Sequence, residues 1–314
     1  MLNIANLDPR RLKRLTKECG WIIAGQILTV AGTLSLVRVL TERLAPAEYG
    51  QLALGLTVAG LLNQVIFGGI GNGICRYYAI AAEAGDLKGY LRNVRTLMAY
   101  GTLAAIVVGI ALLILLHLSG HSQWVGLVVA GILFAVFGAY NSAISGIQNA
   151  ARQRAIVAIH GGMNAWLKIV FAIAVMAWLG ATSEAAVIGY VLSTLVVTLS
   201  QIIFLRQTIP RCTLPRERQH DWIPKIWSYS WPFTAFGLFT WMQQVSDRWA
   251  LDIFGSTTDV GYYAVLFQLG YSPILLATGM ATAFLSPILF QRSGDATSLA
   301  RNNNVHQLSW HLTS

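Results

Sequence analysis

Long apolar segments dominate this sequence and constrain its fold more than any other feature. A helix needs about 20 consecutive apolar residues to cross a bilayer. Segments of that kind lie at about residues 19–40, 50–75, 97–117, 124–147, 155–179, 185–205, 228–254 and 260–290. Of the 314 residues, 55% are hydrophobic and 11% are charged, whereas a soluble domain carries about 25% charged residues. The sequence therefore predicts an all-α membrane protein with about eight transmembrane helices, and it excludes a soluble globular enzyme.

The basic residues alternate between the two sides of the predicted helices. Most of the 22 Lys and Arg residues fall in the amino-terminal arm and in every second loop, and the outer loops hold only Arg43. Loops rich in Lys and Arg stay on the cytoplasmic side of a membrane, so both termini are predicted to be cytoplasmic. The net charge of +9 has the same explanation, and no nucleic-acid partner is expected.

The first apolar segment has a second interpretation as a cleaved signal peptide, because residues 45–47 include small side chains near its end. The apolar run is too long for a signal peptide, and Arg38, Glu42 and Arg43 intervene before that site. Signal peptides have a short apolar core. The sequence therefore favours an uncleaved first helix.

Two parts of the chain resemble each other and predict an internal repeat. Each part ends one apolar segment and begins the next, and the two parts cover residues 38–50 and 248–262. Arg38 corresponds to Arg248, and Gly50 corresponds to Gly261. Parallel repeats in transporters form two lobes with the substrate path between them. Chance similarity between two apolar hairpins is the alternative.

The repeat divides the chain into five predicted regions. They are a basic cytoplasmic arm (1–18), an amino-terminal six-helix lobe (19–205), a basic cytoplasmic linker (206–227), the first two helices of a second, parallel-repeat lobe (228–290) and a polar cytoplasmic tail (291–314). Because the second lobe has only two helices, we expect a truncated chain or a fragment that pairs with another chain.

Several short motifs resemble a known family when they are taken in order. Residues 44–50 form a Pro/acidic/Tyr-Gly turn that leads into a glycine-rich helix, and Trp231-Pro232 opens the seventh helix. The pair Asp247-Arg248 then precedes a Gly-Tyr turn. This arrangement is similar to the bacterial polysaccharide (oligosaccharide) flippases of the multidrug/oligosaccharidyl-lipid/polysaccharide exporter superfamily, over about residues 15–290. Members of that family have more helices than are predicted here.

The resemblance implies a transporter, not an enzyme, of the bacterial cytoplasmic (inner) membrane. It would move a polyprenyl-diphosphate-linked oligosaccharide by alternating access, for surface polysaccharide biosynthesis. The implied partners are that lipid-linked oligosaccharide, the lipid bilayer, and a polysaccharide polymerase or assembly machinery; no cofactor or metal is expected. The alternatives are a cation-coupled multidrug antiporter, a peptidoglycan-precursor flippase, and an inactive truncated product. A glycosyltransferase or ligase is disfavoured because the loops carry no Asp-x-Asp and no His-rich group.

A row of polar residues in the fifth predicted helix provides the first candidate site. His160, Asn164 and Lys168 are spaced four residues apart, which places them on one face of a helix. A charged side chain at the bilayer centre costs about 2.5–3.5 kcal/mol on insertion scales, so Lys168 is expected to face the bundle interior or a cavity. Alternatively, His160 and Asn164 bond to neighbouring helices, and Lys168 neutralises an acidic partner.

The seventh predicted helix carries Asp247 and Arg248, with Gln244 one turn before Arg248. These three residues are candidates for a substrate cavity, and a local Asp247–Arg248 ion pair is the alternative. Arg38 is a candidate because it corresponds to Arg248 in the repeat. A long side chain near a helix end can also extend to the membrane interface, which is the alternative for Arg38.

Asn63 and Gln64 in the second predicted helix are candidates for binding sugar hydroxyls, or they form hydrogen bonds between helices. Within the predicted spans, basic residues outnumber acidic ones. Arg and Lys bind phosphate oxygens, so this bias favours an anionic substrate over a cationic drug.

Tryptophans mark the predicted helix ends. Indole rings settle at the headgroup level of membranes, so the tryptophans near helix ends are predicted to be interfacial anchors. They are Trp124, Trp178, Trp222, Trp227 and Trp231.

Overall fold

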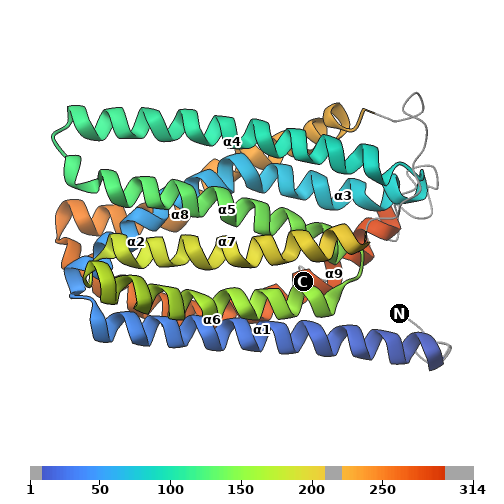
Figure 1. Cartoon of the computed structure of the whole chain (residues 1–314), viewed down its shortest axis with the longest axis horizontal. Helices are drawn as coiled ribbons and strands as arrows, with labels where there is room; N and C mark the ends of the chain where they lie inside the picture. Colours follow the sequence, from blue (N-terminus) through green and yellow to red (C-terminus); the bar gives the residue numbers. More distant parts are fainter. Residues whose placement is uncertain (1–8, 209–220, 294–314) are drawn as a thin grey trace.

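The computed structural model describes residues 9–208 and 221–293, and all regular secondary structure within them is helical. The long helices run side by side along one axis of the molecule (Figure 1). In chain order the elements are α1 (Pro9–Arg43), α2 (Pro46–Leu61), η2 (Leu62–Gly68), α3 (Gly69–Glu83), α4 (Leu87–Leu118), η3 (Ser122–Trp124), α5 (Val125–Ala150), α6 (Arg154–Leu179), α7 (Ser183–Thr208), α8 (Ile223–Phe254) and α9 (Thr257–Ser293).

Three of the predicted regions extend beyond the described residues. The predicted arm, linker and tail include residues 1–8, 209–220 and 294–314, which lie outside the described part of the chain.

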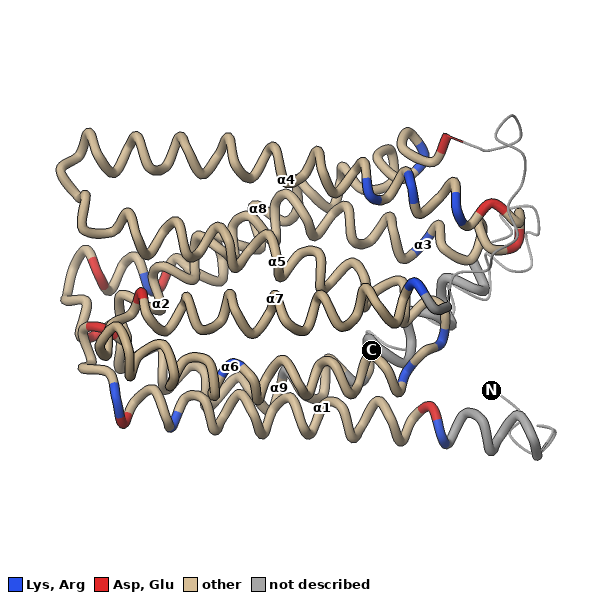
Figure 2. The backbone as a smooth tube through the Cα atoms, in the orientation of Figure 1, with Lys and Arg blue, Asp and Glu red and all other residues tan. Residues whose placement is uncertain are grey.

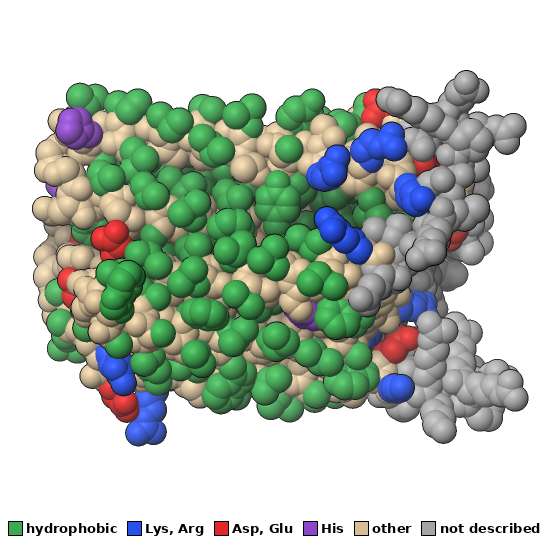
Figure 3. All heavy atoms as spheres, viewed as in Figure 1, with side chains coloured by type: hydrophobic (Ala, Val, Ile, Leu, Met, Phe, Trp, Pro, Cys, Tyr) green, Lys and Arg blue, Asp and Glu red, His purple; other side chains and the backbone are tan. Residues whose placement is uncertain are grey.

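The two ends of the bundle differ in charge (Figure 2). Lys and Arg gather at the end that holds the start of α1, the α3–α4 turn and the α5–α6 turn, which we call the basic end. The opposite end, which we call the distal end, holds the α1–α2, α4–α5, α6–α7 and α8–α9 turns. Between the two ends, the face seen in Figure 3 is mainly hydrophobic.

Among the described residues, seven helical stretches are long and apolar enough to cross a membrane: α1, the α2–η2–α3 stretch, η3 with α5, and α4, α6, α7 and α9. α8 also has 32 residues, but its polar residues Gln243, Gln244, Asp247 and Arg248 make it less apolar. It packs in the same bundle, against α3 and η2. The chain is a multi-pass, all-α membrane protein, which confirms the predicted fold class.

The start of α8 differs from its prediction. α8 begins at Ile223, inside the predicted linker, because Trp222 packs into a cluster of tyrosine rings on α3 and α4. The indole Nε1 of Trp222 donates a hydrogen bond of 2.9 Å to the carboxylate of Asp86. Trp222 has only 1% of its surface exposed. It is therefore a core residue, and its prediction as a membrane anchor is wrong.

The second membrane-spanning stretch contains a π-helical segment, η2, between α2 and α3. Such segments are rare and often lie at functional sites. α8 packs closely against η2 because Gly237 has no side chain to block the backbone carbonyl of Gln64. The indole of Trp241 donates a hydrogen bond of 2.8 Å to the carbonyl of Thr57. These contacts fix α8 against the middle of the bundle.

The hairpins α1–α2 and α8–α9 meet near the distal end. A Cβ atom on Gly50 would overlap the carbonyl group of Thr257, and a Cβ atom on Gly261 would overlap the carbonyl group of Pro46. Only glycine therefore permits this approach of α2 and α9. The two glycines that correspond in the sequence repeat lie together at this helix crossing, since a Cβ on Gly50 would be 3.1 Å from the Gly261 nitrogen.

Candidate functional site

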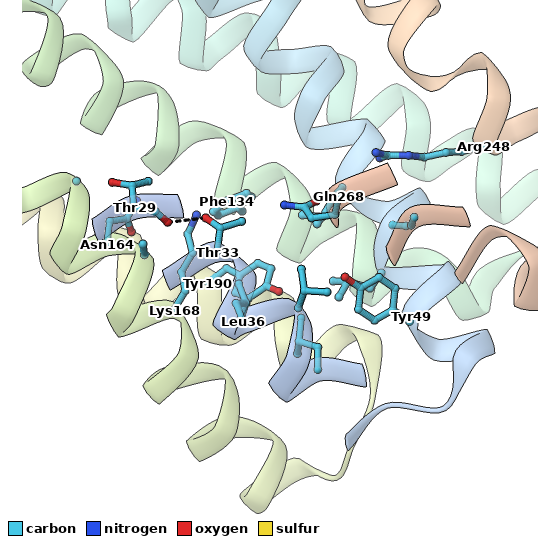
Figure 4. A pocket seen from close by; sticks show the side chains of 18 residues that line it. Thr29, Thr33, Leu36, Tyr49, Phe134, Asn164, Lys168, Tyr190, Arg248 and Gln268 are labelled. Carbon is cyan, nitrogen blue, oxygen red and sulfur yellow. Dashed lines mark hydrogen bonds between the residues drawn. The ribbon is translucent and has the colours of Figure 1, made fainter. Parts of the chain in front are cut away.

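A cavity of about 250 Å³ lies inside the bundle, with walls from α1, α2, α5, α6, α7, α8 and α9; we call it the central cavity. Its polar lining consists of Thr29, Thr33, Tyr49, Asn164, Lys168, Tyr190, Arg248 and Gln268. Lys168 and Arg248 reach it from opposite sides (Figure 4). Among the described residues that line it, none is Asp or Glu. The cavity therefore has a cationic, hydrogen-bonding lining within a membrane-embedded bundle.

Lys168 projects from the middle of α6 and is partly exposed. Its Nζ atom lies 5.0 Å from the ring centroid of Phe134 and 5.8 Å from that of Tyr190, within the range at which a ring face attracts a cation. No carboxylate of the described residues forms an ion pair with Lys168. The acidic partner considered from the sequence is not found among these residues, and the ammonium group can attract an anion.

Arg248 projects from α8, and its guanidinium carbon lies 5.6 Å from the ring centroid of Phe267. Its Nε atom is buried and has no hydrogen-bond partner among the described residues. The neighbouring Asp247 is exposed and accepts a hydrogen bond of 2.8 Å from the Tyr263 hydroxyl. Asp247 does not line the central cavity, and no ion pair joins it to Arg248.

The polar row on α6 divides into two environments. Asn164 and Lys168 line the central cavity, whereas His160 does not. His160 is 3% exposed; its Nδ1 donates to the carbonyl of Ile156 at 2.8 Å, and its Nε2 lies 3.1 Å from the Ser200 hydroxyl. Both ring nitrogens therefore have partners on α6 and α7. This agrees with the alternative in which His160 bonds to a neighbouring helix.

Arg38 lies outside the central cavity, near the distal end of α1. Its Nε donates to Glu42 at 2.9 Å, and the two side chains are 82% and 60% exposed. An exposed pair of this kind contributes little to stability. Arg38 and Arg248 therefore occupy different environments despite their correspondence in the repeat.

The candidates Asn63, Gln64 and Gln244 also lie away from the central cavity. Asn63 donates to the carbonyl of Ala59 at 3.0 Å and lines a separate cavity of about 330 Å³ between η2, α3, α4 and α5. Gln64 donates to the side-chain oxygen of Gln244 at 3.4 Å, which links η2 to α8. These amides form local or interhelical hydrogen bonds.

Several residues of the central cavity were not among the sequence candidates. Tyr49 lies in the first turn of α2, within a stretch whose sequence pattern was noted, but the sequence did not show that its side chain faces a cavity. Tyr190 and Gln268 lie in apolar stretches of α7 and α9 without a local signal. Only the packing of distant helices brings them beside Lys168 and Arg248.

The chemistry that this lining supports is binding, because cations, hydroxyls and amides can hold an anionic, hydroxyl-rich molecule. Within the described residues, no group of three or more His, Cys, Asp and Glu side chains could hold a metal ion. The central cavity is smaller than the roughly 300–1,000 Å³ of sites that enclose a drug-sized ligand. In this conformation it fits a small charged group better than an entire oligosaccharide.

Comparison with solved structures identifies the fold. A chain described as protein A superposes with a TM-score of 0.69 at 15% identity, covering 90% of this chain and 66% of that chain. A mutant of the Vibrio cholerae MATE transporter VcmN gives 0.63 at 13% identity, covering 95% and 69%. An outward-facing multidrug resistance MATE family transporter of the MOP superfamily gives 0.56 at 14% identity, covering 94% and 67%. The chain spans about two thirds of the length of these structures.

Sequence comparison identifies the family. No curated protein sequence matches the chain. A family described as polysaccharide biosynthesis protein matches residues 15–293, which is most of the chain and nearly the same region in which the sequence motifs were found. The chain therefore belongs to the polysaccharide biosynthesis protein family and has the MATE transporter fold, which confirms the family assignment made from its sequence.

Proposed function

We propose that this chain is a flippase that moves a polyprenyl-diphosphate-linked oligosaccharide across the bacterial cytoplasmic membrane. The observation that carries the proposal is the central cavity, which presents Lys168 and Arg248 without a carboxylate among its described lining residues. Uncompensated cations are costly at membrane depth and mark substrate pathways. A negatively charged group that binds between them offsets that cost.

The diphosphate is the part of the substrate that fits this cavity. Arg binds phosphate oxygens through two parallel hydrogen bonds, and Lys acts as a point charge. The hydroxyl and amide groups around them, from Tyr49, Tyr190 and Gln268, can complete the hydrogen bonds of the anion. The lipid tail remains in the bilayer, and the sugars occupy space that opens in another conformation.

The proposed orientation in the membrane follows from the distribution of charge. The basic end carries the Lys- and Arg-rich turns (Figure 2), so we place it in the cytoplasm. The hairpins meet through Gly50 and Gly261 near the distal end. Separation of this contact would open the cavity to the outer side, and closure near the basic end would complete alternating access.

Surface-polysaccharide export in the native host, with the chromosomal copy deleted and the chain supplied on a plasmid, tests the proposal. Lys168→Gln should lower export at least tenfold at equal protein abundance, and Lys168→Arg should retain part of it. Arg206→Gln is the control, because Arg206 is an exposed cation on α7 that lines none of the described cavities. Wild-type export by Lys168→Gln would contradict the proposal, and Lys168-dependent resistance to a cationic dye would favour an antiporter.

A further inference from the structure

A second, smaller cavity continues from the central cavity toward the basic end. Its volume is about 130 Å³, and it shares Thr29 and Gly161 with the central cavity. Its walls come from α1, from the first turns of α6, and from Asn149 at the end of α5. The two cavities therefore follow one another along the α1–α6 interface.

Arg154 on the wall of this second cavity is buried although it lies at the basic end. Only 6% of its surface is exposed. One terminal nitrogen donates to the Asn149 side-chain oxygen at 2.7 Å, and its buried Nε has no hydrogen-bond partner among the described residues. A guanidinium group has five N–H donors. The protein thus leaves much of the hydrogen-bonding capacity of Arg154 unused beside a cavity.

The position of Arg154 in its helix adds to the unbalanced positive charge. Arg154 is the first residue of α6, and the preceding Gln153 provides no side-chain cap. The amino-terminal end of a helix carries a partial positive charge and unpaired N–H groups, which favour an anion and disfavour a cation. A buried arginine at this place is therefore unfavourable in the absence of an anion.

The nearest compensating charges do not remove this imbalance. Glu18 on α1 lies within electrostatic range of Arg154, and Arg152 contributes an opposing positive charge. Glu18 does not line the second cavity, and no acidic residue of the described part of the chain lines it. The cavity therefore presents Arg154, the first turns of α6 and the Asn149 amide to a bound group.

We propose that the second cavity is a binding site for a phosphate group, at which Arg154 receives the substrate from the basic end before it passes to Lys168 and Arg248. The proposal rests on the proposed flippase function and extends it by a first binding position. A phosphate oxygen can accept hydrogen bonds from the guanidinium and from helix N–H groups together. Such a phosphate could belong to an isoprenoid diphosphate or to a phospholipid headgroup.

Binding of inorganic pyrophosphate to the full chain in neutral phosphatidylcholine nanodiscs tests the site. The proteins compared are wild type, Arg154→Gln, Arg154→Lys, Lys168→Gln and the control Arg206→Gln. Arg154→Gln should weaken binding at the second cavity about tenfold, whereas Arg206→Gln should bind as wild type does. Arg154→Lys should bind several-fold more weakly than wild type, because lysine keeps the charge but cannot form paired hydrogen bonds. Melting temperatures show whether each variant is folded.

The outcomes separate this site from the central cavity. If wild type, Arg154→Gln and Arg154→Lys bind pyrophosphate with equal affinity, the second cavity is not a phosphate site. This conclusion holds even if Lys168→Gln binds weakly and the central cavity is therefore supported as a binding site. If Arg154→Gln loses affinity for pyrophosphate and Lys168→Gln does not, the result supports binding in the second cavity and contradicts binding in the central cavity. If Arg154→Gln does not fold, wild-type affinity of Arg154→Lys overturns the proposal.

A second set of nanodiscs containing phosphatidylglycerol distinguishes the two sources of phosphate. If the Arg154-dependent difference persists in these discs, the site selects the diphosphate. If phosphatidylglycerol removes the difference, a phospholipid headgroup occupies the phosphate site, and the assignment to the substrate is overturned.

Discussion

The hairpins α1–α2 and α8–α9 have related sequences but place their corresponding arginines in different surroundings. Arg38 is 82% exposed and paired with Glu42, whereas Arg248 lines the central cavity with a buried, unpartnered Nε. The corresponding glycines, Gly50 and Gly261, are in contact with each other's helices. The comparison shows that a repeated residue can keep its place in the chain while its chemical role depends on what packs around it.

The largest effect is expected at the feature that the two hairpins share. In Gly50→Ala, the new methyl group would overlap the backbone carbonyl of Thr257, which cannot rotate away as a side chain can. Overpacking of this kind typically costs about 1–3 kcal/mol. Export should fall more than tenfold, and the melting temperature of the purified protein should fall as well.

Gly138→Ala is the matched control, since a Cβ atom at Gly138 of α5 would meet no heavy atom within 4 Å. It should export normally and melt at the wild-type temperature. If Gly50→Ala behaved like Gly138→Ala, the close contact of the two hairpins would not be required for function.

A smaller effect is expected where the hairpins differ. Arg248→Gln removes a cation from the central cavity, and the loss of one charge-assisted interaction with a phosphate is worth about 1.5–3 kcal/mol. Surface-polysaccharide export should therefore fall about tenfold or more at limiting substrate supply, with unchanged protein abundance.

The smallest effect is expected for the corresponding change in the first hairpin. Arg38→Gln removes an exposed pair with Glu42, which solvent screens, so export and abundance should remain at wild-type levels in the same assay. Equal losses from Arg38→Gln and Arg248→Gln would show that position in the repeat, not the surroundings, determines the role of these arginines.

The helical fold could be predicted from sequence because the length and polarity of a segment decide whether it can cross a bilayer. The boundaries were less predictable where tertiary contacts extend a helix, as at Trp222, whose indole is held by Asp86. The π-helical segment η2 was not predicted either. Its residues Leu62–Gly68 precede a glycine-rich stretch, but composition does not show which hydrogen-bonding pattern a helix adopts.

The candidate site could be predicted in part, and the geometry of a helix explains the division. Residues four apart are offset by about 40° around a helix, so His160 lies about 80° from Lys168. That rotation turns His160 toward Ser200 on α7, while Asn164 and Lys168 face the central cavity. Tyr190 and Gln268 could not be found because the contacts that bring them to the cavity join distant parts of the chain.

The central claim, that Lys168 and Arg248 bind one anion together, is tested most directly by a double-mutant cycle for pyrophosphate binding in neutral nanodiscs. The four proteins are wild type, Lys168→Gln, Arg248→Gln and the double variant. Each single change should weaken binding at the central cavity about tenfold, and the double variant should lose clearly less than the product of the two losses there, because the residues share a ligand. Losses that multiply, or no loss in either single variant, would contradict the claim.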